Sequence, residues 1–377
     1  MKIGIMTMHR ILNYGSYLQA FGLKRLIEEM GHEVIFVDYK VEASVGELQK
    51  LKKQKSPAAL KKICNKIKIG KNKALRIIRR EKNSFACFIS EFEKNYLRTL
   101  GISKEKQYCS QVDVLVIGSD EVFNCTQGEK VGFSKELFGA HNQAGKVISY
   151  AASFGNTTME KLKKYNIDET IAPLLNQFTG LSVRDLNSYN IIKSLIEKDA
   201  DMHLDPVLIY DFRDDIKDTV KEKDYIIVYA YNHRMTKEEG EAIRKFANDK
   251  NKKLIAISGE QDFCDEYRYC EPLEMLSYFK HADYVVTDTF HGTIFSVINH
   301  VPFATIIRED EKANGYGNQE KLGYLLEKLN LAERQVQDIR KLGKTLDEFI
   351  DFEPVDELIK KERTRTRKYL ENQFQNY

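Results

Sequence analysis

Residues 287–293, with the sequence TDTFHGT, form the densest group of side chains that could do chemistry. They fall between a run expected to be a strand and one expected to be a helix, so His291 lies in the first turn of that helix. A helix N-terminus attracts anions, and an imidazole exchanges protons near neutral pH. With the hydroxyl of Thr289 and with Gly292, the pattern indicates an anion-binding and acid–base site. A purely structural histidine is the alternative.

Arg184 follows the apolar residues 181–183, at the end of a second expected strand. An arginine is costly to bury there unless an anion or a carboxylate accepts its guanidinium group. The position therefore indicates recognition of an anion. An ion pair with the adjacent Asp185, or exposure to solvent, is the alternative.

Residues 118–124 (GSDEVFN) form a polar turn directly after a strongly apolar strand. Asp120 could act there as a general base or orient a sugar hydroxyl, with Ser119 and Asn124 beside it. A helix cap made by Ser119 or by Asp120 would explain the same residues without a ligand.

The first turn of the sequence, residues 13–16 (NYGS), is another candidate for anion binding. Gly15 permits close approach of the backbone, and the helix that begins here offers N–H groups to an anion. We expect Asn13 and Tyr14 to face the same cleft as the other turns. An ordinary capped turn is the alternative. The small residues of 149–155 leave a similar choice between a tight turn and a ligand.

Alternating strands and helices must position these turns. Such alternation is typical of α/β proteins with parallel sheets, in which ligands bind beyond the carboxyl ends of the strands. We expect strands at 2–8, 33–38, 113–117, 146–150, 181–183, 225–231, 253–258, 284–287 and 303–307. We expect helices at 17–30, 158–177, 237–250, 272–280, 290–299 and 353–372.

The pattern restarts between about residues 205 and 224. This predicts two doubly wound, Rossmann-like α/β domains that face each other across a cleft. The predicted N-terminal domain covers 1–210 and carries a basic helical insertion at about 48–95. The second α/β domain covers 211–350, and 351–377 form a charged C-terminal helix.

The composition excludes several classes of protein. The chain has 377 residues, 42% apolar and 31% charged, and no uninterrupted apolar run reaches ~18 residues. Its apolar start is too short for a signal peptide, so a cytoplasmic protein is expected. The six cysteines form neither a C-x-x-C pair nor a zinc pattern, and are expected to be thiols. P-loop, dinucleotide-binding and nucleophile-elbow motifs are absent from the sequence.

Charge is distributed unevenly along the chain. Residues 50–82 contain fourteen Lys or Arg and one acid, a net charge of +13, which leaves −10 for the rest of a chain of net charge +3. A second basic cluster lies between Lys360 and Lys368. Because aromatics are not interleaved in the first segment, nucleic acid is not an expected partner. A solvated helical hairpin is one interpretation, and docking to an anionic membrane or glycolipid is the other.

Six segments of the sequence, taken in order, resemble the polysaccharide pyruvyl transferase family. The resemblance extends from the first strand to about Arg334. Any one segment would be modest evidence, whereas all six in this order are specific for the family. They are KIGIMTMHRILNYGSYLQAFGLKRLIEEMGHEVIFVDY, DVLVIGSDEVFN, ISYAASFG, LSVRD, LDPVLI and TDTFHGTIFSVINHVPFATI.

The resemblance implies a two-domain fold like that of GT-B glycosyltransferases, with the donor bound by the second domain. It implies a ketal pyruvyl transferase, which moves pyruvate from phosphoenolpyruvate to two hydroxyls of a sugar and releases phosphate. Phosphoenolpyruvate would be the donor substrate, and no cofactor or metal is expected. The acceptor would be a sugar or a lipid-linked oligosaccharide, a precursor of a cell-surface polysaccharide.

The same resemblance suggests roles for the residues singled out above. Arg184 would bind the carboxylate or phosphate of the donor, and His291 would bind phosphate or supply a proton. Asp120 would be a base or a hydroxyl anchor, and Arg308 or Lys312 would complete the anion pocket unless their loop is solvated. Further substrate-binding residues would be Asn13, Tyr14, Gly15, Ser119, Asn124, Thr289 and Gly292.

The sequence departs from the usual family pattern at three of these positions. Glu121 and Phe123 stand where Gln and Trp are common, and Thr289 stands where Ser is common. These changes leave the acceptor open.

Two other classes of function stay open at this point. A GT-B-type glycosyltransferase with a nucleotide-sugar donor is the first, because a fold does not fix chemistry. A non-catalytic binding protein that has kept the cleft is the second. The expected location is the cytoplasm, with the basic helices in peripheral contact with the inner face of the membrane.

Overall fold

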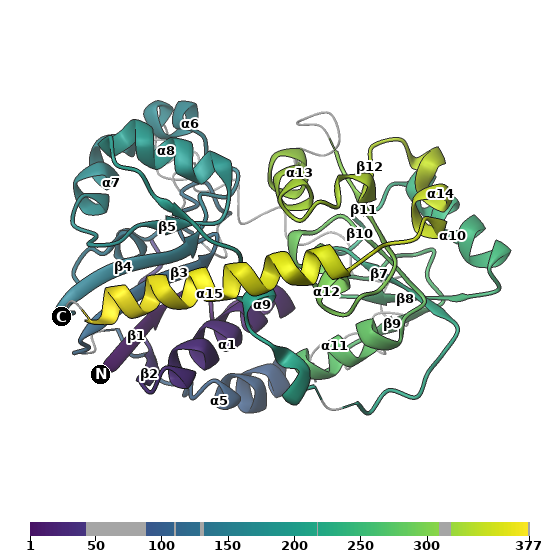
Figure 1. Ribbon diagram of the computed structural model, residues 1–377, viewed down its shortest axis with the longest axis horizontal. Coiled ribbons are helices and arrows are strands. Elements are labelled where there is room, and N and C mark those ends of the chain that lie inside the picture. The colour runs from purple at the N-terminus through teal and green to yellow at the C-terminus, as the bar shows by residue number, and fades with distance from the viewer. Residues whose placement is uncertain (43–87, 109–110, 129–131, 217, 309–317, 376–377) are drawn as a thin grey trace, which may run out of the picture.

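The computed structural model describes residues 1–42, 88–108, 111–128, 132–216, 218–308 and 318–375. Within these ranges the chain forms two six-stranded sheets, one in each of two domains (Figure 1). Neighbouring strands within each sheet are parallel. The predicted pair of doubly wound α/β domains is therefore confirmed. The basic segment 50–82, where helices were expected, lies outside the described residues.

The first sheet has the strand order β2-β1-β3-β4-β5-β6. The chain moves outward from β1 to β2 and then returns to place β3 on the other side of β1. Such a reversal opens a crevice beyond the carboxyl ends of the two strands that flank it. The strands are β1 (Lys2–Met6), β2 (Glu33–Phe36), β3 (Val114–Asp120), β4 (Lys146–Ala152), β5 (Ser182–Val183) and β6 (Asp201–Met202).

The second sheet has the strand order β12-β11-β10-β7-β8-β9. Its reversal lies between β7 and β10, so that a second crevice opens beyond the ends of these two strands. The strands are β7 (Tyr225–Tyr229), β8 (Lys253–Ile257), β9 (Glu266–Arg268), β10 (Tyr284–Thr287), β11 (Phe303–Ile306) and β12 (Gln335–Val336).

Helices cover both faces of each sheet. The longer ones are α1 (Tyr14–Glu29), α8 (Leu186–Ile196), α10 (Lys237–Asp249), α11 (Pro272–His281), α12 (Phe290–Ile298), α13 (Gln319–Lys328) and α15 (Glu353–Gln375). The shorter ones are α5 (Leu97–Thr99), α6 (Met159–Lys164), α7 (Asp168–Leu175), α9 (Pro206–Ile209) and α14 (Leu342–Asp347). Further short helical segments are η1 (Phe92–Tyr96), η2 (Lys135–Phe138), η3 (Phe212–Asp214), η4 (Ala332–Arg334) and η5 (Ile339–Lys341).

Successive residues of a strand enter different hydrophobic clusters because side chains alternate between the faces of a sheet. Ile5 of β1 packs into a cluster that continues into the second domain through α9, α12 and α15, whereas Met6 packs into one confined to the first domain. In β7, Ile227 joins the shared cluster and Val228 joins a third cluster beneath α10 and α14. The shared cluster holds the two domains together.

Helix α15 follows the second domain in sequence but runs back over the first (Figure 1). Its Tyr369 hydroxyl donates a hydrogen bond to the Ser149 carbonyl at 2.8 Å, and Lys146 donates to the Gln373 carbonyl at 2.6 Å. The buried side chains of Tyr369, Leu370 and Phe374 lie in the shared core. The predicted charged C-terminal segment is therefore also a structural element of the first domain.

Several elements differ from the prediction. Strand β3 continues to Asp120, three residues beyond the expected end, so the first part of the predicted turn 118–124 pairs with β4. The helix expected over 158–177 is interrupted at Asn166, which has φ 54° and separates α6 from α7. Of the helices in the described part of the chain, none is long and apolar enough to cross a membrane.

Candidate functional site

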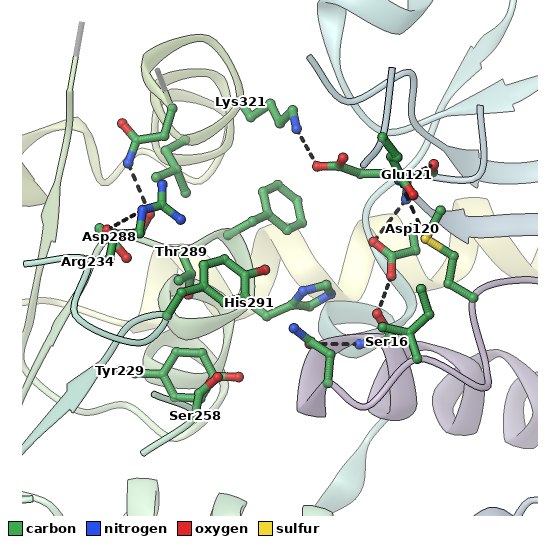
Figure 2. A pocket seen from close by; sticks show the side chains of 18 of the residues that line it. Ser16, Asp120, Glu121, Tyr229, Arg234, Ser258, Asp288, Thr289, His291 and Lys321 are labelled. Atoms are coloured by element: carbon green, nitrogen blue, oxygen red, sulfur yellow. Dashed lines mark hydrogen bonds and ion pairs between the residues drawn. The ribbon is translucent and has the colours of Figure 1, made fainter. Parts of the chain in front are cut away.

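A cavity of about 190 Å³ lies between the domains, beyond the carboxyl ends of β1, β3, β7 and β10 (Figure 2). It therefore sits at the point where the strand order reverses in both sheets. The first domain lines it with Met8, Ile11, Asn13, Ser16, Asp120, Glu121, Gln127 and Arg184. The second domain lines it with Tyr229, Tyr231, Arg234, Ser258, Asp288, Thr289, Phe290, His291, Asn318, Lys321 and Leu322.

Arg184 is buried in the wall of the cavity and is held by two carboxylates of its own domain. Its Nη1 donates to Asp205 Oδ2 at 2.6 Å, and its Nη2 donates to Asp120 Oδ1 at 3.3 Å. The guanidinium also lies 4.5 Å from the ring centroid of Phe290 in the second domain. Burial acts to lower the pKa of Arg184, but the carboxylates outweigh it and raise the pKa, so this side chain stays charged.

Asp205 is the centre of this network, although its role was not predicted from the sequence. It caps α9 through the Val207 N–H at 3.0 Å, and it accepts a hydrogen bond from Ser119 Oγ at 3.1 Å. Burial would raise the pKa of Asp205, but the neighbouring His291 and Arg184 hold it well below its usual range. The signal in the sequence is the aspartate directly before Pro206, a pattern typical of the start of a helix.

His291 projects from the first turn of α12 toward the first domain. Thr289 caps this helix by accepting the Gly292 N–H at 3.0 Å. The imidazole stacks on Phe295, with 6.0 Å between centroids, and its Nε2 lies 3.7 Å from Asp205 Oδ2. The side chain is 12% exposed, and no described residue hydrogen-bonds its buried Nε2. The ring is therefore fixed in place, and its Nε2 lies next to Asp205 without a hydrogen bond to a described residue.

The beginning of α1 closes the cavity on the side of the first domain. Asn13 Oδ1 accepts the N–H groups of Gly15 at 2.8 Å and of Ser16 at 3.3 Å, which are thus used in capping. Ser16 Oγ donates to Asp120 Oδ2 at 2.6 Å. Asp120 has φ 73°, an uncommon conformation for a residue other than glycine, and this turn of the backbone accompanies its position at the end of β3.

Asp288 supports the wall of the second domain. Its Oδ2 pairs with Arg234 Nε at 2.9 Å and also with Arg308. Arg308 is further engaged by Glu239 Oε2 at 2.7 Å. Arg308 therefore supports Asp288 through an ion pair and does not line the cavity. Lys312, the alternative to Arg308 in the prediction, lies outside the described residues.

The ion pair of Lys321 with Glu121 crosses from the second domain to the first in the lining of the cavity. Figure 2 shows Lys321 of α13 reaching the carboxylate of Glu121, which follows β3. Asn124 Nδ2 donates to the other carboxylate oxygen of Glu121 at 2.7 Å. Burial would raise the pKa of Glu121, but Lys321 and Asn124 lower it to about 2.

The structure brings five of the predicted site residues to the cavity, namely Asn13, Asp120, Arg184, Thr289 and His291. Four others contact residues of the site without lining the cavity. Ser119 hydrogen-bonds to Asp205, Asn124 hydrogen-bonds to Glu121, Gly15 packs against the ring of His291, and the Gly292 N–H takes part in the cap of α12. Tyr14 does not line the cavity, because its hydroxyl donates to the Cys270 carbonyl at 3.0 Å in the second domain. The prediction did not single out Ser16, Arg234, Ser258, Asp288 or Lys321, and Asp205 and Glu121 were not predicted as site residues.

The turn 287–293 and the residues around it identify the type of site. A buried arginine, three carboxylates and a histidine at a helix N-terminus meet in a small cavity, a combination suited to an anion and to proton transfer. Within the described ranges, no group of three His, Cys, Asp or Glu is arranged to hold a metal ion.

Several solved structures resemble this chain at low sequence identity. The UDP-GlcNAc 2-epimerase of Methanocaldococcus jannaschii has a TM-score of 0.46 and 13% identity, covering 96% of this chain and 99% of that one. The UDP-GlcNAc 2-epimerase of Neisseria meningitidis has a TM-score of 0.46 and 10% identity, with complete coverage of both chains. A mutant O-GlcNAc transferase of Thermobaculum terrenum has a TM-score of 0.45 and 10% identity, and this chain, matched over its full length, spans 66% of it.

Sequence comparison identifies the family. A search of the curated proteins finds no match. The sequence profile described as polysaccharide pyruvyl transferase matches residues 13–310, which is more than half of the chain and includes the turns that carry Asp120, Arg184 and His291. The chain therefore belongs to the polysaccharide pyruvyl transferase family, a family of transferases.

Proposed function

We propose that this protein transfers pyruvate from phosphoenolpyruvate to a pair of hydroxyls on a sugar, forming a cyclic ketal and releasing phosphate. The observation that carries the proposal is the meeting of His291, Arg184 and Asp120 in one cavity of a chain that belongs to the pyruvyl transferase family. The acceptor is a sugar, free or in a lipid-linked oligosaccharide, that serves as a precursor of a surface polysaccharide.

The reaction adds one proton to a carbon atom of the donor and removes one proton from each of two sugar hydroxyls. Protonation of the methylene carbon of phosphoenolpyruvate makes C2 electrophilic, and a first hydroxyl attacks C2 with loss of its proton. The bond from C2 to the phosphate oxygen then breaks, and a second hydroxyl closes the ring at C2. One of the two hydroxyl protons replaces the proton taken up by the methylene carbon, and the other leaves with the phosphate.

The described residues can serve these steps. His291 lines the cavity, and its Nε2 lies 3.7 Å from the Asp205 carboxylate without a hydrogen bond to a described residue. We assign the imidazolium as the proton donor. Asp120 accepts hydrogen bonds from Ser16 and Arg184, and we assign it to anchor an attacking hydroxyl and take its proton. Arg184 keeps its hydrogen bonds to Asp205 and Asp120 and thereby holds Asp120 in position, while its guanidinium contributes positive charge to the wall beside the donor.

Thermal unfolding in the presence of candidate donors tests the proposal. Phosphoenolpyruvate at about 100 times its dissociation constant should stabilise the protein by roughly 2.7 kcal/mol. His291→Ala should keep most of this stabilisation but lose acceptor-dependent phosphate release. Stabilisation by a UDP- or GDP-sugar, with none by phosphoenolpyruvate, would contradict the proposal in favour of glycosyl transfer. Turnover by His291→Ala equal to that of the wild type would refute its assigned role.

A further inference from the structure

Within the described part of the chain, the arginine and lysine side chains that line the cavity are each paired with a carboxylate. These pairs carry no surplus positive charge, and a carboxylate beside a bound anion repels it. Any of these described cations that binds an anionic donor must therefore leave or share its carboxylate partner. The pairs are Arg184 with Asp205 and Asp120, Arg234 with Asp288, and Lys321 with Glu121.

The first two of these groups are poorly suited to exchange. Arg184 and Asp205 are both buried within the first domain. Asp288 is fully buried within the second domain and braced by Arg308 as well as Arg234. Loss of Arg184 would leave the buried Asp205 carboxylate without its guanidinium partner, which is strongly unfavourable, and Arg234 is paired with a carboxylate that water does not reach.

The pair of Lys321 and Glu121 differs in three respects. Both of its members are partly exposed, with 15% of the lysine side chain and 22% of the glutamate side chain accessible, whereas Arg234 is 17% exposed but its partner Asp288 is 0% exposed. Its members belong to different domains, and Glu121 keeps the hydrogen bond from Asn124 when the lysine leaves. Lys321 lies in the first turn of α13, at the helix end that attracts anions, and its ammonium is a compact charge on a flexible stem.

We propose that Lys321 is a donor-binding residue whose ammonium is held by Glu121 while the cleft is empty and is taken over by the phosphate or carboxylate of the donor. Glu121 then competes with the donor for the same cation and thereby sets the donor affinity. The inference rests on the proposed function, because phosphoenolpyruvate supplies the anion. Lys321 lies beyond the region 13–310 that matches the family, so membership by itself assigns it no role.

Donor binding in the absence of acceptor tests this assignment. The dissociation constant for phosphoenolpyruvate, taken from thermal unfolding over a range of concentrations, should rise at least about tenfold in Lys321→Met. It should fall about three- to tenfold in Glu121→Gln, because an uncharged amide retains the contact with Asn124 but releases the ammonium.

Lys328→Met is the matched control. Lys328 lies on the same helix, its side chain is 19% exposed, and it pairs with Glu362 at 3.9 Å away from the cavity. The affinity for phosphoenolpyruvate should stay at the wild-type value in this variant. An equal loss of affinity in Lys328→Met and Lys321→Met would point to a general effect on α13 and overturn the assignment.

The expected changes in donor affinity are opposite in Lys321→Met and Glu121→Gln, and this distinguishes donor binding by Lys321 from a purely structural ion pair. A clamp that merely joins the domains predicts weaker donor binding in both variants, so weaker or unchanged binding in Glu121→Gln would overturn the proposal even if Lys321→Met failed to fold. Wild-type affinity in a folded Lys321→Met would overturn this assignment alone. A wild-type protein that phosphoenolpyruvate does not stabilise would overturn both the assignment and the proposed donor.

Discussion

At the scale of single residues, the contact between Gly15 and His291 decides how closely the domains approach. The imidazole from α12 lies directly on the backbone of α1, and a Cβ at position 15 would be 2.1 Å from Nδ1 and 2.3 Å from Cγ of His291. A ring held by the helix, by Phe295 and by this backbone cannot move aside without losing its place next to Asp205. The glycine is thus required by the partner across the cleft.

Gly15→Ala should lower the free energy of unfolding by about 1–3 kcal/mol and should abolish most acceptor-dependent phosphate release, because it displaces His291. Urea unfolding and a phosphate-release assay measure the two effects. Gly323→Ala is the matched control, since a Cβ on this helical glycine would lie 3.8 Å from Gln335 Oε1, an ordinary van der Waals contact. It should gain up to about 1 kcal/mol of stability from better helix propensity. A Gly15→Ala protein with wild-type stability and turnover would contradict this account.

Residue types at strand ends could be predicted from the sequence, but their partners could not. The fork of Arg184 was expected to meet an anion or Asp185; the structure gives it Asp205 and Asp120, while Asp185 instead caps α8 through the Ser188 N–H. Asp205 is 21 residues away in sequence and reaches Arg184 because β5 and the start of α9 converge at the domain junction. Local sequence carries no information about such a long-range pairing.

At the scale of elements, α15 depends on a buried histidine. His203 lies beneath the helix with its ring centroid 4.7 Å from that of Tyr369, and its Nδ1 is 2.8 Å from Ser182 Oγ. Burial, with smaller contributions from Arg365 and Lys328, lowers the pKa of His203 to about 3. The neutral imidazole is therefore part of the surface on which the last helix docks.

The stability of the fold should fall as the pH drops below about 6.5. The unfolded chain binds a proton at His203 with a pKa near 6.5, whereas the folded chain does so only near 3. Between these values the unfolded state holds more protons, so the free energy of unfolding decreases, by about 2 kcal/mol at pH 5 from this group. Urea unfolding at pH 5, 6 and 7 measures the slope.

His203→Asn should be less stable at every pH and should show a smaller loss between pH 7 and pH 5. The exposed His141, which has φ 57°, provides the control His141→Asn, because asparagine tolerates this conformation and the side chain meets water in both states. That variant should keep the wild-type slope. If the free energy of unfolding of His203→Asn falls with pH as steeply as that of the wild type, other groups cause the loss of stability at acid pH.

Elements with a long periodic pattern were predicted well, and short ones were not. Strands such as β7 and helices such as α10 have enough apolar residues at the right spacing to be predicted from the sequence. Strands β6 and β12 have two residues each and β9 has three, so tertiary pairing rather than local pattern defines them. The same reason explains α9, whose four residues begin at the Asp205 cap.

At the scale of the whole molecule, the two domains share one hydrophobic core and meet in a cleft where the described arginines and lysine are each paired with a carboxylate. The strongest charge asymmetry lies elsewhere, in the sequence of residues 50–82, with net charge +13 in a chain whose remainder carries −10. A surplus of this size acts at a distance on a polyanionic surface and is screened by salt. An enzyme with a lipid-linked acceptor would gain from being held at an anionic membrane.

The purified protein should float with vesicles that contain anionic phospholipid at low ionic strength and should be released as the salt concentration rises. Each lysine or arginine near such a surface contributes about 1 kcal/mol, so a segment with fourteen of them should bind readily. Replacement of eight of these residues by glutamine should remove flotation while leaving thermal stabilisation by phosphoenolpyruvate unchanged. Vesicles of neutral lipid are the control for non-specific capture. Absence of flotation with anionic vesicles at low salt would rule out membrane docking by this segment and direct the search to a water-soluble acceptor.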